Sequence, residues 1–93
     1  MKAAQIFDHL SAMRNDGTLT AFVRSGLIGP KAVAYLDMYI RVKEKQRRLK
    51  RTPRKVIIIQ VAEEYRVSTA TVYRAINLME LPLHVQTAAT ANR

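Results

Sequence analysis

The glycines and prolines place the strongest limit on what this chain folds into. Only three of each occur among 93 residues, and they fall between segments whose apolar residues recur at the i, i+3, i+4, i+7 spacing of an amphipathic helix. In the first segment, this stripe consists of Ala3, Ile6, Phe7, Leu10 and Met13. The pattern predicts an all-α fold with about five helices, near residues 3–13, 18–24, 30–50, 52–65 and 68–80.

Residues typical of helix ends mark the boundaries of these segments. Gly17 is suited to the left-handed conformation that ends a helix. Pro30 fits the first position of the third helix, where its missing N–H costs nothing. We expect Thr52, followed by Pro53, to cap the fourth helix, and Ser68 to cap the fifth.

The third predicted helix changes character halfway along. Its first part is apolar on nearly all sides, whereas residues 43–50 are mostly charged. A helix that is apolar all round needs cover on more than one side. We therefore expect a second copy of the chain to cover one face, while Leu36 and Ile40 face the chain's own core. The residues expected at this dimer interface are Tyr35, Met38, Tyr39 and Val42. The alternative is that the helix is the centre of a monomeric core.

Positive charge is concentrated in one short stretch. The chain has 16 Lys and Arg residues against 7 Asp and Glu, a net charge of +9. Residues 41–55 hold nine basic residues and one acid, Glu44, a net charge of +8; the other 78 residues carry seven basic and six acidic groups, a net of +1. Such a concentration is expected of a protein that binds a polyanion. Alone, it suits DNA, RNA or an anionic membrane surface.

The sequence does not favour several other classes of protein. It has no cysteine, which excludes disulfides and cysteine-ligated zinc. No apolar run approaches the roughly 20 residues of a membrane span, and no signal peptide is evident, so we expect a cytoplasmic, nucleoid-associated protein.

His9 and His84 are far apart in sequence, and the adjacent Glu63 and Glu64 cannot face each other across a substrate. We expect no enzyme activity, no metal, no cofactor and no small-molecule ligand.

Residues 61–76, VAEEYRVSTATVYRAI, have the spacing of two helices that cross at a steep angle. Ala62 is small enough for a close crossing, and Val67 lies where an apolar residue plugs the turn, directly before the expected cap of the next helix. Val72 and Ile76 are four residues apart, so both face the first helix. The segment therefore predicts two short helices joined by a tight turn.

This segment, Val61–Ile76, resembles the helix-turn-helix of the lac-type repressors and of many phage and plasmid regulators. The layout of the chain is loosely similar to small phage or mobile-element regulators of the Mor type. The family's turn usually has glycine at the position of Arg66, so the resemblance implies a positive φ there, at a cost of about 1 kcal/mol. It also implies that Thr69, Ala70 and Arg74 reach base edges in the major groove.

Phosphate contacts are expected from the basic stretch and from the start of the fifth helix. The basic residues lead into the first helix of the motif, which is expected to approach the DNA backbone. The expected backbone-contacting residues are Arg47, Arg48, Lys50, Arg51, Arg54, Lys55, Ser68, Thr71 and Tyr73. For these positions, and for the three base-reading ones, the alternative is a solvated helix surface.

The sequence thus predicts a helical core and dimerisation region in residues 1–50, a DNA-binding unit in residues 51–81 and a flexible tail in residues 82–93. The predicted function is sequence-specific binding of double-stranded DNA by a homodimer, as a transcriptional regulator of phage, plasmid or bacterial origin. One alternative is a plasmid or phage partition or replication factor. Another is a protein-interaction module whose basic stretch docks an acidic partner. RNA binding is less favoured, because the sequence lacks the aromatic stacking platforms of single-strand readers.

Overall fold

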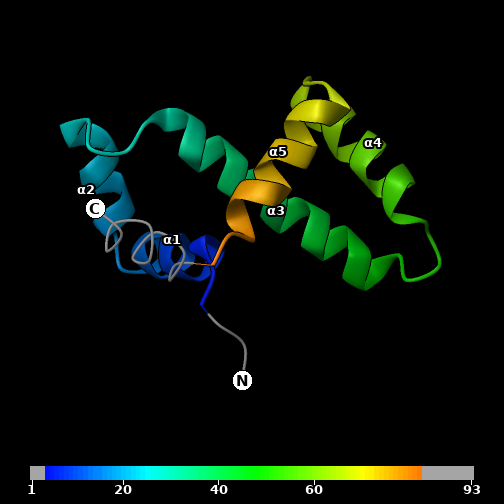
Figure 1. The fold of residues 1–93 in the computed structure, drawn as a ribbon, viewed down its shortest axis with the longest axis horizontal. Helices are drawn as coiled ribbons and strands as arrows, with labels where there is room; N and C mark the ends of the chain where they lie inside the picture. Colours follow the sequence, from blue (N-terminus) through cyan, green and yellow to red (C-terminus); the bar gives the residue numbers. More distant parts are fainter. Residues whose placement is uncertain (1–3, 83–93) are drawn as a thin grey trace, which may run out of the picture.

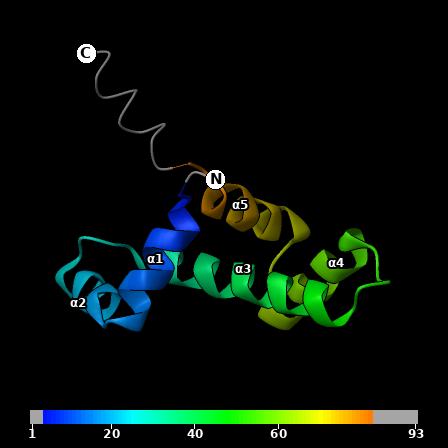
Figure 2. The same cartoon turned by 90° about the horizontal axis from the view of Figure 1, so that it is seen from below.

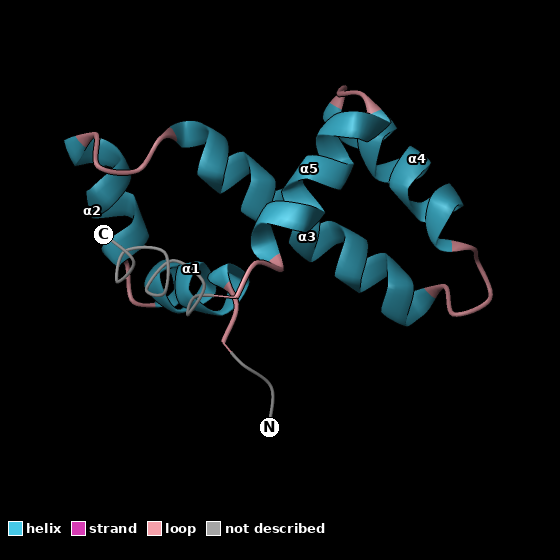
Figure 3. Ribbon diagram, viewed as in Figure 1, coloured by secondary structure: helices cyan, strands magenta, loops and turns pink. Residues whose placement is uncertain are grey.

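The structure, a computed structural model, describes residues 4–82, and their regular structure consists of five helices (Figure 1). In chain order the helices are α1 (Ile6–Asn15), α2 (Thr18–Ser25), α3 (Pro30–Arg48), α4 (Arg54–Tyr65) and α5 (Thr69–Met79). The all-α prediction with about five helices is confirmed, and Figure 3 shows the short loops that join them. Except for Pro82, the predicted tail lies outside the described residues, and so does His84.

Backbone conformation explains where several helices begin and end. Gly17 and Gly26 flank α2 and each has a φ of 84°, a left-handed conformation that glycine adopts without steric cost. Pro30 opens α3 as predicted. The prediction that Thr52 caps the fourth helix is wrong, because Pro53 is its N-cap residue and no side chain caps it. The backbone at Pro53 is extended, with a ψ of 145°, so α4 starts one residue later than expected.

The long helix α3 lies at the centre of the fold. α4 and α5 both pack on it and on each other, while α1 packs against α2, α3 and α5. Figures 1 and 2 both show α2 at one end of the molecule and the loop between α3 and α4 at the other. The N–H of Ile6 donates to the carbonyl of Leu81 at 2.9 Å, which ties the start of α1 to the end of α5.

One continuous core of buried side chains joins all five helices. Its members are Leu10, Met13, Leu19, Leu36, Met38, Tyr39, Val42, Ile57, Ile58, Val61, Ala62, Val72, Ala75, Ile76 and Met79. The central helix α3 thus shares one core with α4 and α5.

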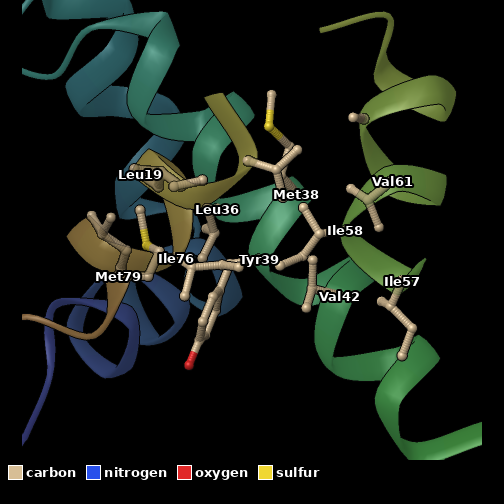
Figure 4. Close-up of a cluster of buried hydrophobic side chains, with 14 of the residues drawn as sticks. Leu19, Leu36, Met38, Tyr39, Val42, Ile57, Ile58, Val61, Ile76 and Met79 are labelled. Atoms are coloured by element: carbon tan, nitrogen blue, oxygen red, sulfur yellow. The ribbon is translucent and has the colours of Figure 1, made fainter. Parts of the chain in front are cut away.

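Three of the four residues expected at the dimer interface lie inside this core. Met38, Tyr39 and Val42 are 4%, 3% and 2% exposed within a single chain, and Figure 4 shows them among side chains of α4 and α5. The fourth, Tyr35, is half-buried and packs against the same core. For Met38, Tyr39 and Val42 the prediction was wrong, because it counted only the two N-terminal helices as cover for α3, whereas α4 and α5 cover it too.

Tyr39 also fixes the end of α5. Its hydroxyl donates a hydrogen bond to the Glu80 carboxylate at 3.0 Å, and its ring packs edge-on against Phe7, with the ring centroids 4.8 Å apart. Burial, followed by the hydrogen bond to Glu80, raises the pKa of Tyr39 to about 12. The neutral phenol therefore connects α1, α3 and the residue that follows α5.

Candidate nucleic-acid interface

The turn between α4 and α5 has the backbone expected from the sequence. Arg66 has a φ of 56° and a ψ of 45°, which is the left-handed conformation. The N–H of Val67 donates to the carbonyl of Ala62 at 2.9 Å, and the Val67 side chain packs against the core. Ser68 caps α5 as predicted, because its hydroxyl accepts a hydrogen bond from the Thr71 N–H at 3.2 Å. These contacts hold the start of α5 against the end of α4.

The helix that follows this turn, α5, has one buried face and one exposed face. The buried residues are Val72, Ala75, Ile76 and Met79. The opposite face carries all three predicted base-reading residues, and its exposed members are Thr69, Ala70, Tyr73, Arg74 and Asn77. One face thus anchors the helix in the core, and the other is open to a ligand.

Two of the predicted phosphate contacts on this side of the molecule serve the helix cap. The hydroxyl oxygens of Ser68 and Thr71 lie 3.1 Å apart, in addition to the bond between Ser68 and the Thr71 N–H. Ser68 is exposed and Thr71 is half-buried. Tyr73 lies further along α5 and is 44% exposed, and it takes no part in this cap.

Eight of the nine basic residues of the stretch fall into two groups, and the first joins α3 to α4. The ninth, Lys43, lies over the Tyr39 ring, with its amine 5.5 Å from the ring centroid. The Arg41 guanidinium lies 2.9 Å from Glu64 on α4 and 3.4 Å from Glu44 on its own helix. Lys45 is only 8% exposed; its amine lies 3.0 Å from Glu64 and donates to Gln60 at 3.1 Å. Hydrogen bonds from Arg41, and then from Lys45, lower the pKa of the Glu64 carboxyl. Sequence reasoning assigned Arg41 and Lys45 to the general positive charge and missed this structural role.

The second group is exposed and takes part in none of the ion pairs formed within residues 4–82. We call it the basic corner; it consists of Arg47, Arg48, Lys50, Arg51, Arg54 and Lys55. These are the same six basic residues that the sequence predicts to contact phosphate. They cluster around the end of α3 and the start of α4, where Arg47, Arg48 and Lys50 line an open hollow together with Arg41 and Glu44.

Part of the basic corner lies beside the exposed face of α5. Lys55, in the first turn of α4, lines a small hollow together with Thr69 and Tyr73 of α5. The first turn of α4 therefore brings positive charge to the side of the exposed α5 face.

Two further features bear on the kind of site this is. Among residues 4–82, no three His, Cys, Asp or Glu side chains gather as they would around a metal ion. In the same part of the chain, no helix combines the length and the apolar character needed to cross a membrane.

Comparisons with known proteins add no relatives. The sequence matches no protein-family model, and no curated protein and no solved structure is significantly similar to it.

Proposed function

We propose that this protein binds double-stranded DNA sequence-specifically, with α5 in the major groove, and that it acts as a transcriptional regulator. The observation that carries the proposal is the division of α5 into two faces. One face is buried in the core, and the other exposes Thr69, Ala70 and Arg74 beside the basic corner. Because its buried face anchors α5 in the core, the helix presents the same exposed side chains to any DNA that it contacts.

The dimensions and chemistry of α5 suit the major groove. The groove is about 12 Å wide and admits an α-helix, and the 11 residues of α5 correspond to a length of about 16 Å. The guanidinium of Arg74 is able to pair with O6 and N7 of guanine, while Ala70 offers an apolar contact to a thymine methyl group. Arg74 is therefore the residue to which we assign most of the base discrimination.

The basic corner supplies the phosphate contacts in this proposal. Its six cations are exposed and unpaired within the described chain, so binding phosphates breaks no internal ion pair. The Tyr73 phenol is exposed beside Lys55 and adds a neutral donor. We favour duplex DNA over duplex RNA because side chains cannot read the deep, narrow major groove of A-form RNA.

The wider role follows from the proposed binding. A cytoplasmic, nucleoid-associated regulator that pairs on two half-sites is the role we propose. A partition or replication factor of a plasmid or phage would use the same contacts and differ only in the DNA that it binds.

Selection of bound sites from random-sequence duplex DNA tests this proposal. We expect a short sequence motif to be enriched, and the affinity for it to fall steeply as the salt concentration rises. Binding of every duplex with equal affinity would contradict sequence-specific recognition. Absence of binding at low salt would contradict DNA binding altogether.

A further inference from the structure

The end of α2 presents an apolar surface that the described chain does not cover. Leu27, in the loop after α2, is 75% exposed, and Phe22, within α2, is 37% exposed. The N–H groups of Leu27 and Ile28 both donate to the carbonyl of Phe22, at 3.0 and 3.2 Å. The loop therefore folds back on α2 and holds Leu27 beside Phe22. We call these two residues the α2 surface.

Two of the four apolar residues of α2, Ala21 and Phe22, are exposed rather than packed in the core. The only buried residue of this helix is Leu19, and α2 packs mainly on α1 rather than on α4 or α5. Solvent exposure of a side chain as large as Leu27 leaves apolar area in water, which is unfavourable. Cover from another molecule would remove that cost.

Charge separates the α2 surface from the basic corner. Residues 6–29 contain two bases, Arg14 and Arg24, and two acids, Asp8 and Asp16, so their formal net charge is zero. Residues 41–55 carry +8, and Figure 1 places them at the end of the molecule opposite α2. Two copies of a chain with a net charge of +9 repel each other. They approach at the lowest electrostatic cost through the neutral end.

We infer that the α2 surface binds a second copy of this chain, in a twofold contact in which Leu27 of each copy packs against the α2 surface of the other. An uncharged apolar surface is complementary to itself, as a twofold contact requires, whereas the basic corner is not. The inference rests on the proposed function, because one α5 contacts few base pairs and helix-turn-helix proteins commonly pair on two half-sites. It moves the interface from α3, where three of the four predicted residues are buried, to α2.

Sedimentation equilibrium of the full chain without DNA, at micromolar concentration, tests the inference. The variants are Leu27→Asp and, as a matched control, Val56→Asp, because Val56 is also apolar and 40% exposed but lies on α4. We expect the wild type and Val56→Asp to sediment at twice the chain mass of 10.6 kDa, and Leu27→Asp at the mass of one chain. Far-UV circular dichroism of Leu27→Asp should match the wild type, because the side chain is exposed.

Three outcomes would overturn the inference: a monomeric wild type, a dimer that survives Leu27→Asp, or equal dissociation of both variants. Occupation of the α2 surface by residues 83–93 of the same chain would give the first of these.

Binding of random-sequence duplex DNA by the same samples separates this inference from the proposed function. If only the proposed DNA binding is wrong, no sample binds DNA, but Leu27→Asp still dissociates the dimer. If only the dimer contact is wrong, the samples still bind DNA, and Leu27→Asp leaves the sedimenting mass unchanged.

Discussion

The two ends of α3 have different neighbours and different charges. Its N-terminal end lies with α1 and α2, in a region where acids and bases balance and where Leu27 remains exposed. Its C-terminal end lies with α4 and α5, and residues 41–55 there carry a net charge of +8. One helix thus joins a neutral region, suited to contact between copies, to a basic region, suited to contact with DNA.

A second contrast exists within the basic stretch itself. Arg41 and Lys45 contact Glu64 on α4, whereas the six residues of the basic corner form no ion pair within residues 4–82. Residues of the same type, a few positions apart on α3, therefore stabilise the fold in one case and remain available to phosphate in the other. The predictions that follow test these two contrasts.

The largest expected effect comes from placing a charge in the core beneath α4 and α5. Met38→Glu puts a carboxylate at a site that is 4% exposed, which should lower the free energy of unfolding by about 4 kcal/mol or more. This is close to the whole stability of a small domain, so urea titration followed by circular dichroism should find the variant largely unfolded. A folded, monomeric Met38→Glu variant would instead restore α3 as the dimer interface.

The next effect concerns the two groups of basic residues, compared through two double variants of equal charge. Replacing Arg47 and Arg48 by Ala should weaken binding to all DNA sequences and lower the slope of log affinity against log salt by about 1.8, which is roughly 0.9 for each phosphate contact. Replacing Arg41 and Lys45 by Ala should change the slope far less and lower the melting temperature instead. Equal changes in slope for both double variants would remove the distinction between the groups.

A smaller effect is expected from the acid that joins α3 to α4. The pKa of Glu64 is lowered, first by Arg41 and then by Lys45, so its ionised form stabilises the fold. This contribution is complete above the unfolded pKa of about 4.3 and is lost as the pH falls through the lower folded value. Glu64→Gln should therefore be less stable than the wild type at neutral pH, with a difference that shrinks in acid. A difference that stays constant from neutral pH into acid would show that these ion pairs contribute nothing.

The smallest effect is expected at the turn between α4 and α5. Arg66 has a φ of 56°, so Arg66→Gly should relieve strain of up to about 1 kcal/mol, partly offset by the greater freedom of glycine in the unfolded chain. Arg66→Val should be clearly destabilising, because β-branched residues are rare at positive φ. Thermal unfolding that ranks Val above Gly would indicate that the turn has a different backbone in solution.

The sequence predicted the local features of the fold well and the long-range ones less well. Helix positions, the Ser68 cap and the positive φ of Arg66, which the resemblance implied, depend on residues close in sequence, although the Thr52 cap, also a local feature, was predicted wrongly. The burial of Met38, Tyr39 and Val42 depends on which helices cover α3, and the periodicity of α3 alone does not contain that information. The contact between Arg41 and Glu64 joins residues 23 positions apart, so counting charges along the chain did not detect it.

The candidate site shows the same division. The resemblance, rather than periodicity, pointed to Thr69, Ala70 and Arg74, and all three lie on the exposed face of α5, opposite its apolar stripe. Neither pointed to the position of Lys55 beside α5, because it depends on how α4 packs against that helix. Lysine and arginine carry no sequence signal that separates an internal ion pair from a free phosphate contact.

The most direct test of the central claim is the effect of Arg74→Ala on binding to the selected DNA sequence and to random duplex DNA. Arg74 is exposed on α5, so the variant should fold like the wild type. If α5 reads bases, the variant should lose about 1–3 kcal/mol on the selected sequence, with relaxed preference at one base pair per half-site, and change little on random DNA. An equal loss on both DNAs would contradict base reading by Arg74 and leave it as a contact to the phosphate backbone.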